Sequence, residues 1–96
     1  MVIKQEIIEV LKNFIDPELG IDVYTLGLIY GVDFDEKKQA VKITMTFTTP
    51  MCPYGPQMVG ELQSRFRALG IDKPEIDVVF DPPWEPSQTV REMLGV

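Results

Sequence analysis

The sequence contains no histidine and a single cysteine among its 96 residues. One cysteine cannot form a disulfide within the chain, which excludes a disulfide-stapled secreted domain. Without histidine, it also cannot supply the ligands of an ordinary tetrahedral zinc site. A Ser-His-Asp or Cys-His catalytic arrangement is impossible for the same reason. We therefore expect a protein that is not an enzyme, since carboxylates are the only candidate acid–base groups and no paired arrangement of them is evident.

Positive charge is also scarce, because 9 Lys and Arg stand against 15 Asp and Glu and give a net charge of −6. Nucleic-acid binding requires clustered basic residues, so no nucleic-acid partner is expected. No apolar run approaches the roughly 18 residues of a membrane span, and the acidic start lacks the regions of a signal peptide. These absences predict a cytoplasmic protein without a membrane partner. The hydrophobic content of 45% is that of a globular chain and predicts one domain over residues 1–96.

Apolar residues at helical spacing predict two helices. The first covers residues 3–14, and Asp16-Pro17 ends it because the residue before a proline avoids the α region. The second begins near Pro56 and ends at Gly70, in the left-handed conformation that glycine favours. Its apolar stripe consists of Met58, Val59, Leu62, Phe66 and Leu69.

Period-two alternation predicts strands over residues 28–34, 41–48 and 75–81, and the short loop at 35–39 makes the first two an antiparallel hairpin. A short final helix is expected over residues 89–94. The fold class is therefore α+β, a two-layer α/β arrangement of order α-β-β-α-β(-α). We expect a small three-stranded mixed sheet with two helices on one face. Its opposite face, with Lys42, Thr44, Thr46 and Val79, is either solvated or a dimer surface.

Cys52 is the first candidate for chemistry, because it lies in a proline-rich run just ahead of the second helix. A thiol at a helix N-terminus feels the positive end of the helix dipole, which lowers its pKa and favours the thiolate. The thiolate is the form that binds metal or attacks sulfur. The competing interpretation is a buried, inert cysteine.

The loop over residues 16–28 is a second candidate, because a loop of this length in a small domain is more often functional or locally packed than idle. The carboxylates of Asp16 and Glu18 can accept backbone hydrogen bonds, ligate a metal or move protons. The alternative is that Asp16 caps a turn and that Gly20 and Gly27 supply special backbone angles. Trp84, after two prolines, either anchors a partner, closes a pocket or covers the edge of the core.

Four motifs in register resemble the metal–sulfur cluster assembly domains, a family also described as PaaD-like or SufT-like. The motifs are residues 16–20 (DPELG), 26–30 (LGLIY), 46–53 (TFTTPMCP) and 81–84 (DPPW). Together they span essentially the whole chain. Some relatives carry a cysteine-rich extension or a nucleotide-binding ATPase, neither of which this sequence shows, so we expect a standalone short form.

The resemblance implies an auxiliary factor in iron–sulfur cluster assembly or in the maturation of iron–sulfur proteins. Such a factor either carries a cluster through Cys52 or targets client proteins. The implied partners are iron–sulfur assembly proteins or apo client proteins, and the implied cofactor is a transient iron–sulfur cluster. The resemblance places the functional site at Cys52 and its companions: Asp16, Glu18, Thr48, Thr49 and Trp84.

A cluster on this chain needs ligands from elsewhere, because its irons take four and the chain has one cysteine. Cys52 would share the cluster with a second chain in a homodimer, with cysteines of a target, or with a small thiol. In two alternative functions the protein binds no cluster itself. One is a protein-binding adaptor that presents Trp84 and the loop around Asp16, and the other is an accessory subunit of a multi-component oxygenase.

Overall fold

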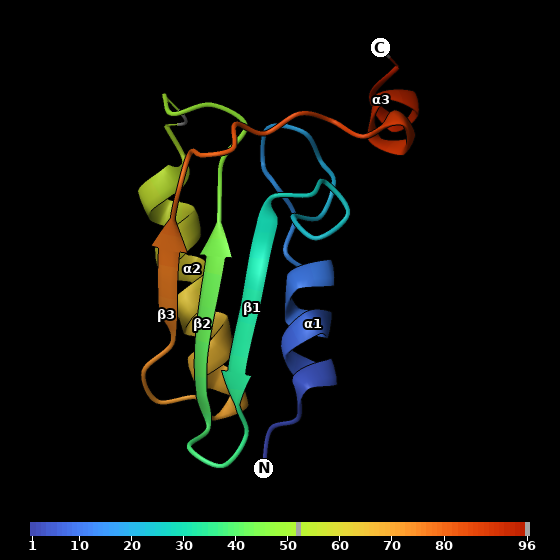
Figure 1. The fold of residues 1–96 in the computed structure, drawn as a ribbon. Coiled ribbons are helices and arrows are strands. Elements are labelled where there is room, and N and C mark those ends of the chain that lie inside the picture. The colour runs from blue at the N-terminus through green and yellow to red at the C-terminus, as the bar shows by residue number, and fades with distance from the viewer. Residues whose placement is uncertain (52, 96) are drawn as a thin grey trace.

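The computed structural model describes residues 1–51 and 53–95, which form three helices and one three-stranded mixed sheet. The predicted α+β class and the order α-β-β-α-β-α are confirmed, including the final helix. Figure 1 shows the elements in chain order. They are α1 (Lys4–Lys12), β1 (Ile29–Asp35), β2 (Ala40–Met45), α2 (Gly55–Leu69), β3 (Glu75–Val78) and α3 (Gln88–Leu94).

Strand β2 lies at the centre of the sheet. It pairs antiparallel with β1, where Phe34 lies opposite Val41, and parallel with β3, where Ile43 lies opposite Ile76. The first pairing is the predicted hairpin. A parallel pair needs a long crossover connection, and α2 supplies it. The residues of β2 that alternate toward the helices, Val41, Ile43 and Met45, are all buried.

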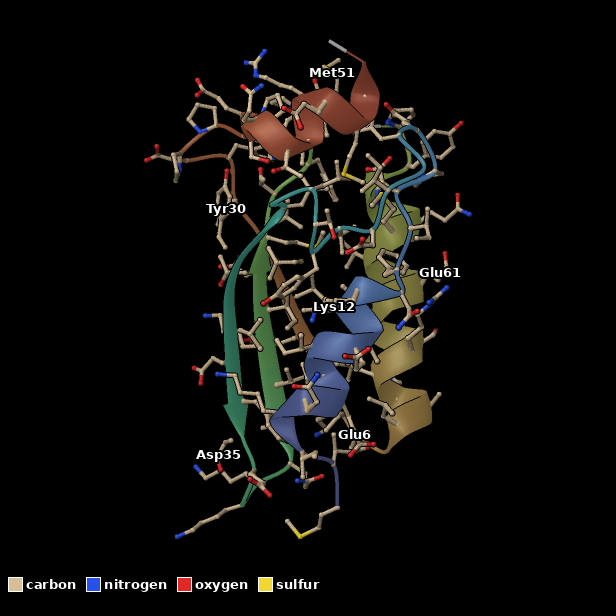
Figure 2. The ribbon with its side chains drawn as sticks, turned by 90° about the vertical axis from the view of Figure 1, so that its right-hand side faces the viewer. Glu6, Lys12, Tyr30, Asp35, Met51 and Glu61 are labelled. Atoms are coloured by element: carbon tan, nitrogen blue, oxygen red, sulfur yellow. The ribbon has the colours of Figure 1, made fainter. Side chains whose placement is uncertain are left out.

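Helices α1 and α2 cover the same face of the sheet, as the edge-on view in Figure 2 shows. Each helix turns its apolar stripe inward against the buried residues of β2, which confirms the predicted two-layer packing. The buried helical side chains are Ile7 and Leu11 in α1 and Met58, Leu62 and Phe66 in α2. Gly70 ends α2 with φ of 118°, the predicted left-handed cap.

Three elements, α1, β2 and β3, are shorter than the sequence pattern predicts, whereas β1 is shifted by one residue and α3 begins one residue earlier. Helix α1 ends at Lys12 rather than residue 14, and Ile3, predicted as its first residue, is its N-cap with 49% of its surface exposed. Strand β2 ends at Met45 rather than residue 48, and β3 ends at Val78 rather than residue 81. Alternating sequence continues beyond both strand ends, but the chains leave the sheet for proline-containing loops.

The uncovered face of the sheet is polar but differs from the prediction at one position. Lys42 is exposed and Thr44 is half-buried there, whereas Thr46 is fully buried. Thr46 lies beyond the end of β2, so the inside–outside alternation no longer applies to it. Among the described residues, no helix is long and apolar enough to cross a membrane.

Candidate functional site

Three connecting segments meet at one end of the molecule, the end where the C-terminus lies (Figure 1). We call this the loop end and define it as residues 13–28, 46–51, 53–54 and 79–87. Hydrogen bonds join the segments, since the Thr46 amide donates to the Leu28 carbonyl at 2.8 Å and the Val79 amide donates to the Met45 carbonyl at 2.8 Å. Motifs far apart in the sequence are therefore held side by side.

Asp16 is buried, with 4% of its surface exposed, and its carboxylate organises the long loop. Its Oδ1 accepts hydrogen bonds from the amides of Glu18 at 2.7 Å and Leu19 at 3.1 Å. The amide of Gly20 donates to the Asp16 carbonyl at 2.8 Å, and Gly20 has φ of 70°. This is the turn-capping arrangement that was the structural alternative for Asp16. In the described part of the chain, no group of three or more Asp, Glu, His or Cys is arranged to hold a metal ion.

Thr48 and Thr49 are both half-buried in the segment that precedes position 52. The Oγ1 of Thr49 accepts a hydrogen bond from the amide of Met51 at 3.2 Å, which makes a local side-chain turn. Thr49 therefore shapes the backbone of this loop. Helix α2 follows with Tyr54 as N-cap, which makes no side-chain capping bond, and its first turn carries no acidic residue.

The start of α2 packs against the ring of Phe47, a residue of the 46–53 motif that was not predicted as a site residue. A Cβ added to Gly55 would lie 2.8 Å from Cε2 of Phe47, a separation that atoms in contact do not reach. The ring of Phe47 also meets Phe80, with centroids 6.2 Å apart and an interplanar angle of 57°. Such tilted pairs add to the stability gained by burial. The sequence indicates this close contact only through Gly55, whose lack of a side chain leaves room for the ring.

Trp84 is half-buried and ties the C-terminal segment to the long loop. Its indole Nε1 donates a 2.7 Å hydrogen bond to the Leu26 carbonyl, and its ring packs against the core. Nearby, the hydroxyl of Tyr30 donates to the Pro82 carbonyl at 2.7 Å. The neighbouring Gly27 has φ of 80°, a left-handed angle that glycine adopts without strain. This geometry matches the interpretation of Trp84 as the cover of a core edge.

The structure thus brings Asp16, Glu18, Thr48, Thr49 and Trp84, five of the six predicted site residues, to the loop end. Glu18 lies in the same loop and is exposed. Cys52, the sixth, lies outside the described residues, so its role as a ligand stays a prediction. The described neighbours on either side of it, Met51 and Pro53, are exposed.

The fold and the loop end define a small α+β domain whose polar and apolar loop residues gather at one end. A family model described as "Iron-sulfur cluster assembly protein" matches residues 4–78. The chain is 40% identical to the Fe-S protein maturation auxiliary factor YitW of Bacillus subtilis, covering 98% of this chain and 95% of that protein. It is 39% identical to the Fe-S protein maturation auxiliary factor SufT of Staphylococcus aureus, covering 85% and 97%.

A solved structure has the same fold. The crystal structure of a domain of unknown function, DUF59, from Bacillus anthracis superposes with a TM-score of 0.82 at 34% identity, covering 97% of this chain and 92% of that one. The chain belongs to the iron–sulfur cluster assembly protein family, which confirms the resemblance found in the four motifs. The names of the two curated relatives describe maturation factors and state no catalytic activity.

Proposed function

We propose that the protein is an auxiliary factor in the maturation of iron–sulfur proteins and that it acts through the loop end. The observation that carries this proposal is the convergence of the family motifs. Three segments that are distant in the sequence meet at one end of a chain that is 40% identical, over nearly its whole length, to a maturation factor. Its role is auxiliary and cytoplasmic, and it catalyses no reaction of its own.

In this proposal Cys52 is the group that contacts the cluster, and the cluster is cargo. Because iron–sulfur clusters take four ligands, Cys52 holds it together with a second copy of the chain, a client's cysteines or a small thiol. Thr49 and Asp16 act as positioning residues, since each fixes its loop by accepting backbone hydrogen bonds. Thr48 and Glu18, which also lie at the loop end, are the further companions of Cys52 that this proposal includes.

The partners in this proposal are iron–sulfur assembly proteins and apo client proteins. The alternative of an adaptor that binds its partner mainly through Trp84 has less support. The indole N–H already donates to the Leu26 carbonyl, and the ring packs on the core. Trp84 acts instead by fixing the C-terminal segment across the loop end.

A cellular measurement tests the proposal. In a strain that lacks the gene, we expect reduced activity of an enzyme that requires an iron–sulfur cluster and unchanged activity of one that requires none. Wild type and the control Gln57→Ser, an exposed substitution on α2, should restore the activity, whereas Cys52→Ser should not. Equal activity of both enzymes with and without the gene would overturn the proposal.

A second measurement addresses the cargo. Anaerobic reconstitution of the purified protein with iron and sulfide should give cluster absorption in the visible range for wild type and Gln57→Ser, and much less for Cys52→Ser. Identical featureless spectra for all three proteins would show that this chain alone does not hold a cluster. The factor would then act by targeting clients.

A further inference from the structure

Large apolar side chains are exposed at the loop end. Met51 has 84% of its surface exposed, Tyr54 43% and Phe80 42%. We call these three residues the apolar patch. Figure 2 shows Met51 at the loop end, far from Asp35 and Glu6 at the opposite end. Single exposed apolar residues are ordinary on a protein surface, but a cluster of them marks an interaction site.

Phe47 links the members of the patch. Its ring lies against Phe80, with a centroid distance of 6.2 Å, and against the backbone of Gly55, which directly follows Tyr54. Met51 belongs to the same short loop as Phe47 and Tyr54, so the three exposed residues lie on the two segments that the Phe47 ring joins.

Two members of the patch, Phe80 and Tyr54, lie directly beside regular elements of the fold. The Val79 amide bonds to the Met45 carbonyl and holds the chain just before Phe80 against the end of β2. Tyr54 occupies the N-cap position of the 15-residue helix α2. Backbone that is already fixed loses little conformational entropy on binding, so these two residues can bind without a rearrangement of the backbone.

The charged residues within the loop end are all acidic, and α3, which follows the loop end in the chain, carries Arg91 and Glu92. Residues 13–28, 46–54 and 79–87 contain no Lys or Arg, although they contain five acids: Asp16, Glu18, Asp22, Asp81 and Glu85. Two cations reach the margin of these segments, where Lys12 lies 5.4 Å from the centre of the Tyr24 ring and Arg65 donates to the Asn13 carbonyl. Arg65 lies on α2 ten residues after Gly55, or about 15 Å along the helix from the patch at the α2 start.

The acidic charge of the loop end indicates which kind of partner the patch can bind. Nucleic acids and anionic membranes are repelled by an acidic surface. A second copy of the chain would bring a net charge of −6 against an equal charge, with acids facing acids across a two-fold contact. A protein surface with an apolar centre and basic residues around it is complementary to the apolar patch and to the acidic residues of the loop end.

We propose that the apolar patch, on a loop end whose charged residues are all acidic, docks apo client proteins through a segment in which an apolar side chain is flanked by Lys or Arg. The inference rests on the proposed function, because a client must approach the loop end to exchange a cluster there. The patch supplies the contact area, and the carboxylates select the client by charge.

The test uses displayed random 12-residue peptides as the probe, selected on the full-length wild-type protein. Selected peptides should combine Lys or Arg with Leu, Ile, Phe or Trp, and their affinity should fall as salt is raised. Met51→Ser and Phe80→Ser should each weaken binding at least tenfold. The control Met93→Ser, at an exposed methionine of α3, should change it less than twofold.

Met51→Ser keeps the test decisive if Phe80→Ser fails to fold, because Met51 is the most exposed member of the patch. The proposal is overturned if no peptide is selected, if the selected peptides are acidic or uncharged, or if both patch variants bind them as wild type does. It is also overturned if sedimentation shows a wild-type dimer that the patch variants dissociate, since the patch would then hold a second copy.

The cellular assay separates this inference from the proposed function. Patch variants that fold but restore full activity of an iron–sulfur enzyme would overturn the docking surface and leave the maturation role standing. Loss of the whole gene without any effect on iron–sulfur enzymes would overturn the maturation role, whatever the peptides do.

Discussion

The indole nitrogen of Trp84 and the carbonyl oxygen of Leu26 are 2.7 Å apart, although 58 positions separate the two residues in the chain. This hydrogen bond fastens the segment after β3 to the loop before β1. A family motif, residues 81–84, thereby supports the fold of another, residues 26–30. The tryptophan has a structural role at the loop end whatever binds there.

Trp84→Phe should lower the free energy of unfolding by about 1–3 kcal/mol, because it leaves the Leu26 carbonyl without its donor and keeps most of the ring packing. Urea unfolding followed by circular dichroism measures the change. The control is Tyr30→Phe, which removes the hydroxyl that donates to Pro82 in an exposed contact and should cost less. Equal stability of Trp84→Phe and wild type would show that the hydrogen bond contributes nothing.

Gly55→Ala should destabilise the protein by about 1–3 kcal/mol, because the new Cβ would overlap the ring of Phe47 and force it to move. Gly60→Ala is the matched control in the same helix, since nothing lies within 4 Å of its added Cβ. Alanine there should stabilise the helix by up to about 1 kcal/mol. Thermal unfolding of the two variants should therefore shift in opposite directions, and a shift in the same direction contradicts the packing argument.

Asp16→Ala should cost about 1–2 kcal/mol, because the amides of Glu18 and Leu19 lose their acceptor. Asp16→Asn retains an oxygen at the same position and should stay close to wild type in stability. The pair separates two roles in the maturation assay. If Asp16 only shapes the turn, Asp16→Asn supports full activity. A stable but inactive Asp16→Asn protein would instead point to a requirement for the negative charge.

The thiol of Cys52 should react with iodoacetamide faster in the folded protein than in the same chain unfolded by urea. The reason is that α2 begins close after it in the sequence and carries no acidic residue in its first turn, so the helix dipole favours the thiolate. The alkylation rate measured against pH gives the pKa. A pKa near the ordinary value of about 8.5 in both states, with slow reaction in the folded state, would favour an inert cysteine.

Local patterns predicted the layers of this fold correctly. The alternation of Val41, Ile43 and Met45 and the glycine at position 70 are features of neighbouring residues, and local rules describe them well. The prediction placed Thr46 on the uncovered face of the sheet, but Thr46 is buried. The apolar–polar alternation continues in the sequence beyond Met45, where β2 ends. The alternation alone does not indicate at which residue the strand ends.

The contacts that organise the loop end could not be predicted in the same way. Phe47 meets Phe80 across 33 positions of sequence, and Trp84 meets Leu26 across 58. Such pairs depend on how the loops leave the sheet, which a single sequence does not state. The segments that carry the motifs do meet at the loop end, while the functional site there, with Cys52 as the group that binds the cluster, stays a prediction.

The two termini lie at opposite ends of the molecule (Figure 1), and its longest dimension is 42 Å. The chain starts beside the hairpin turn, whereas α3, the last element, lies at the same end of the molecule as the surface proposed for clients. A fusion partner, dye or surface linkage at the start of the chain therefore leaves that surface accessible, whereas one at the finish crowds it. Paired fusions at the two ends should differ in client capture while their unfolding temperatures remain equal.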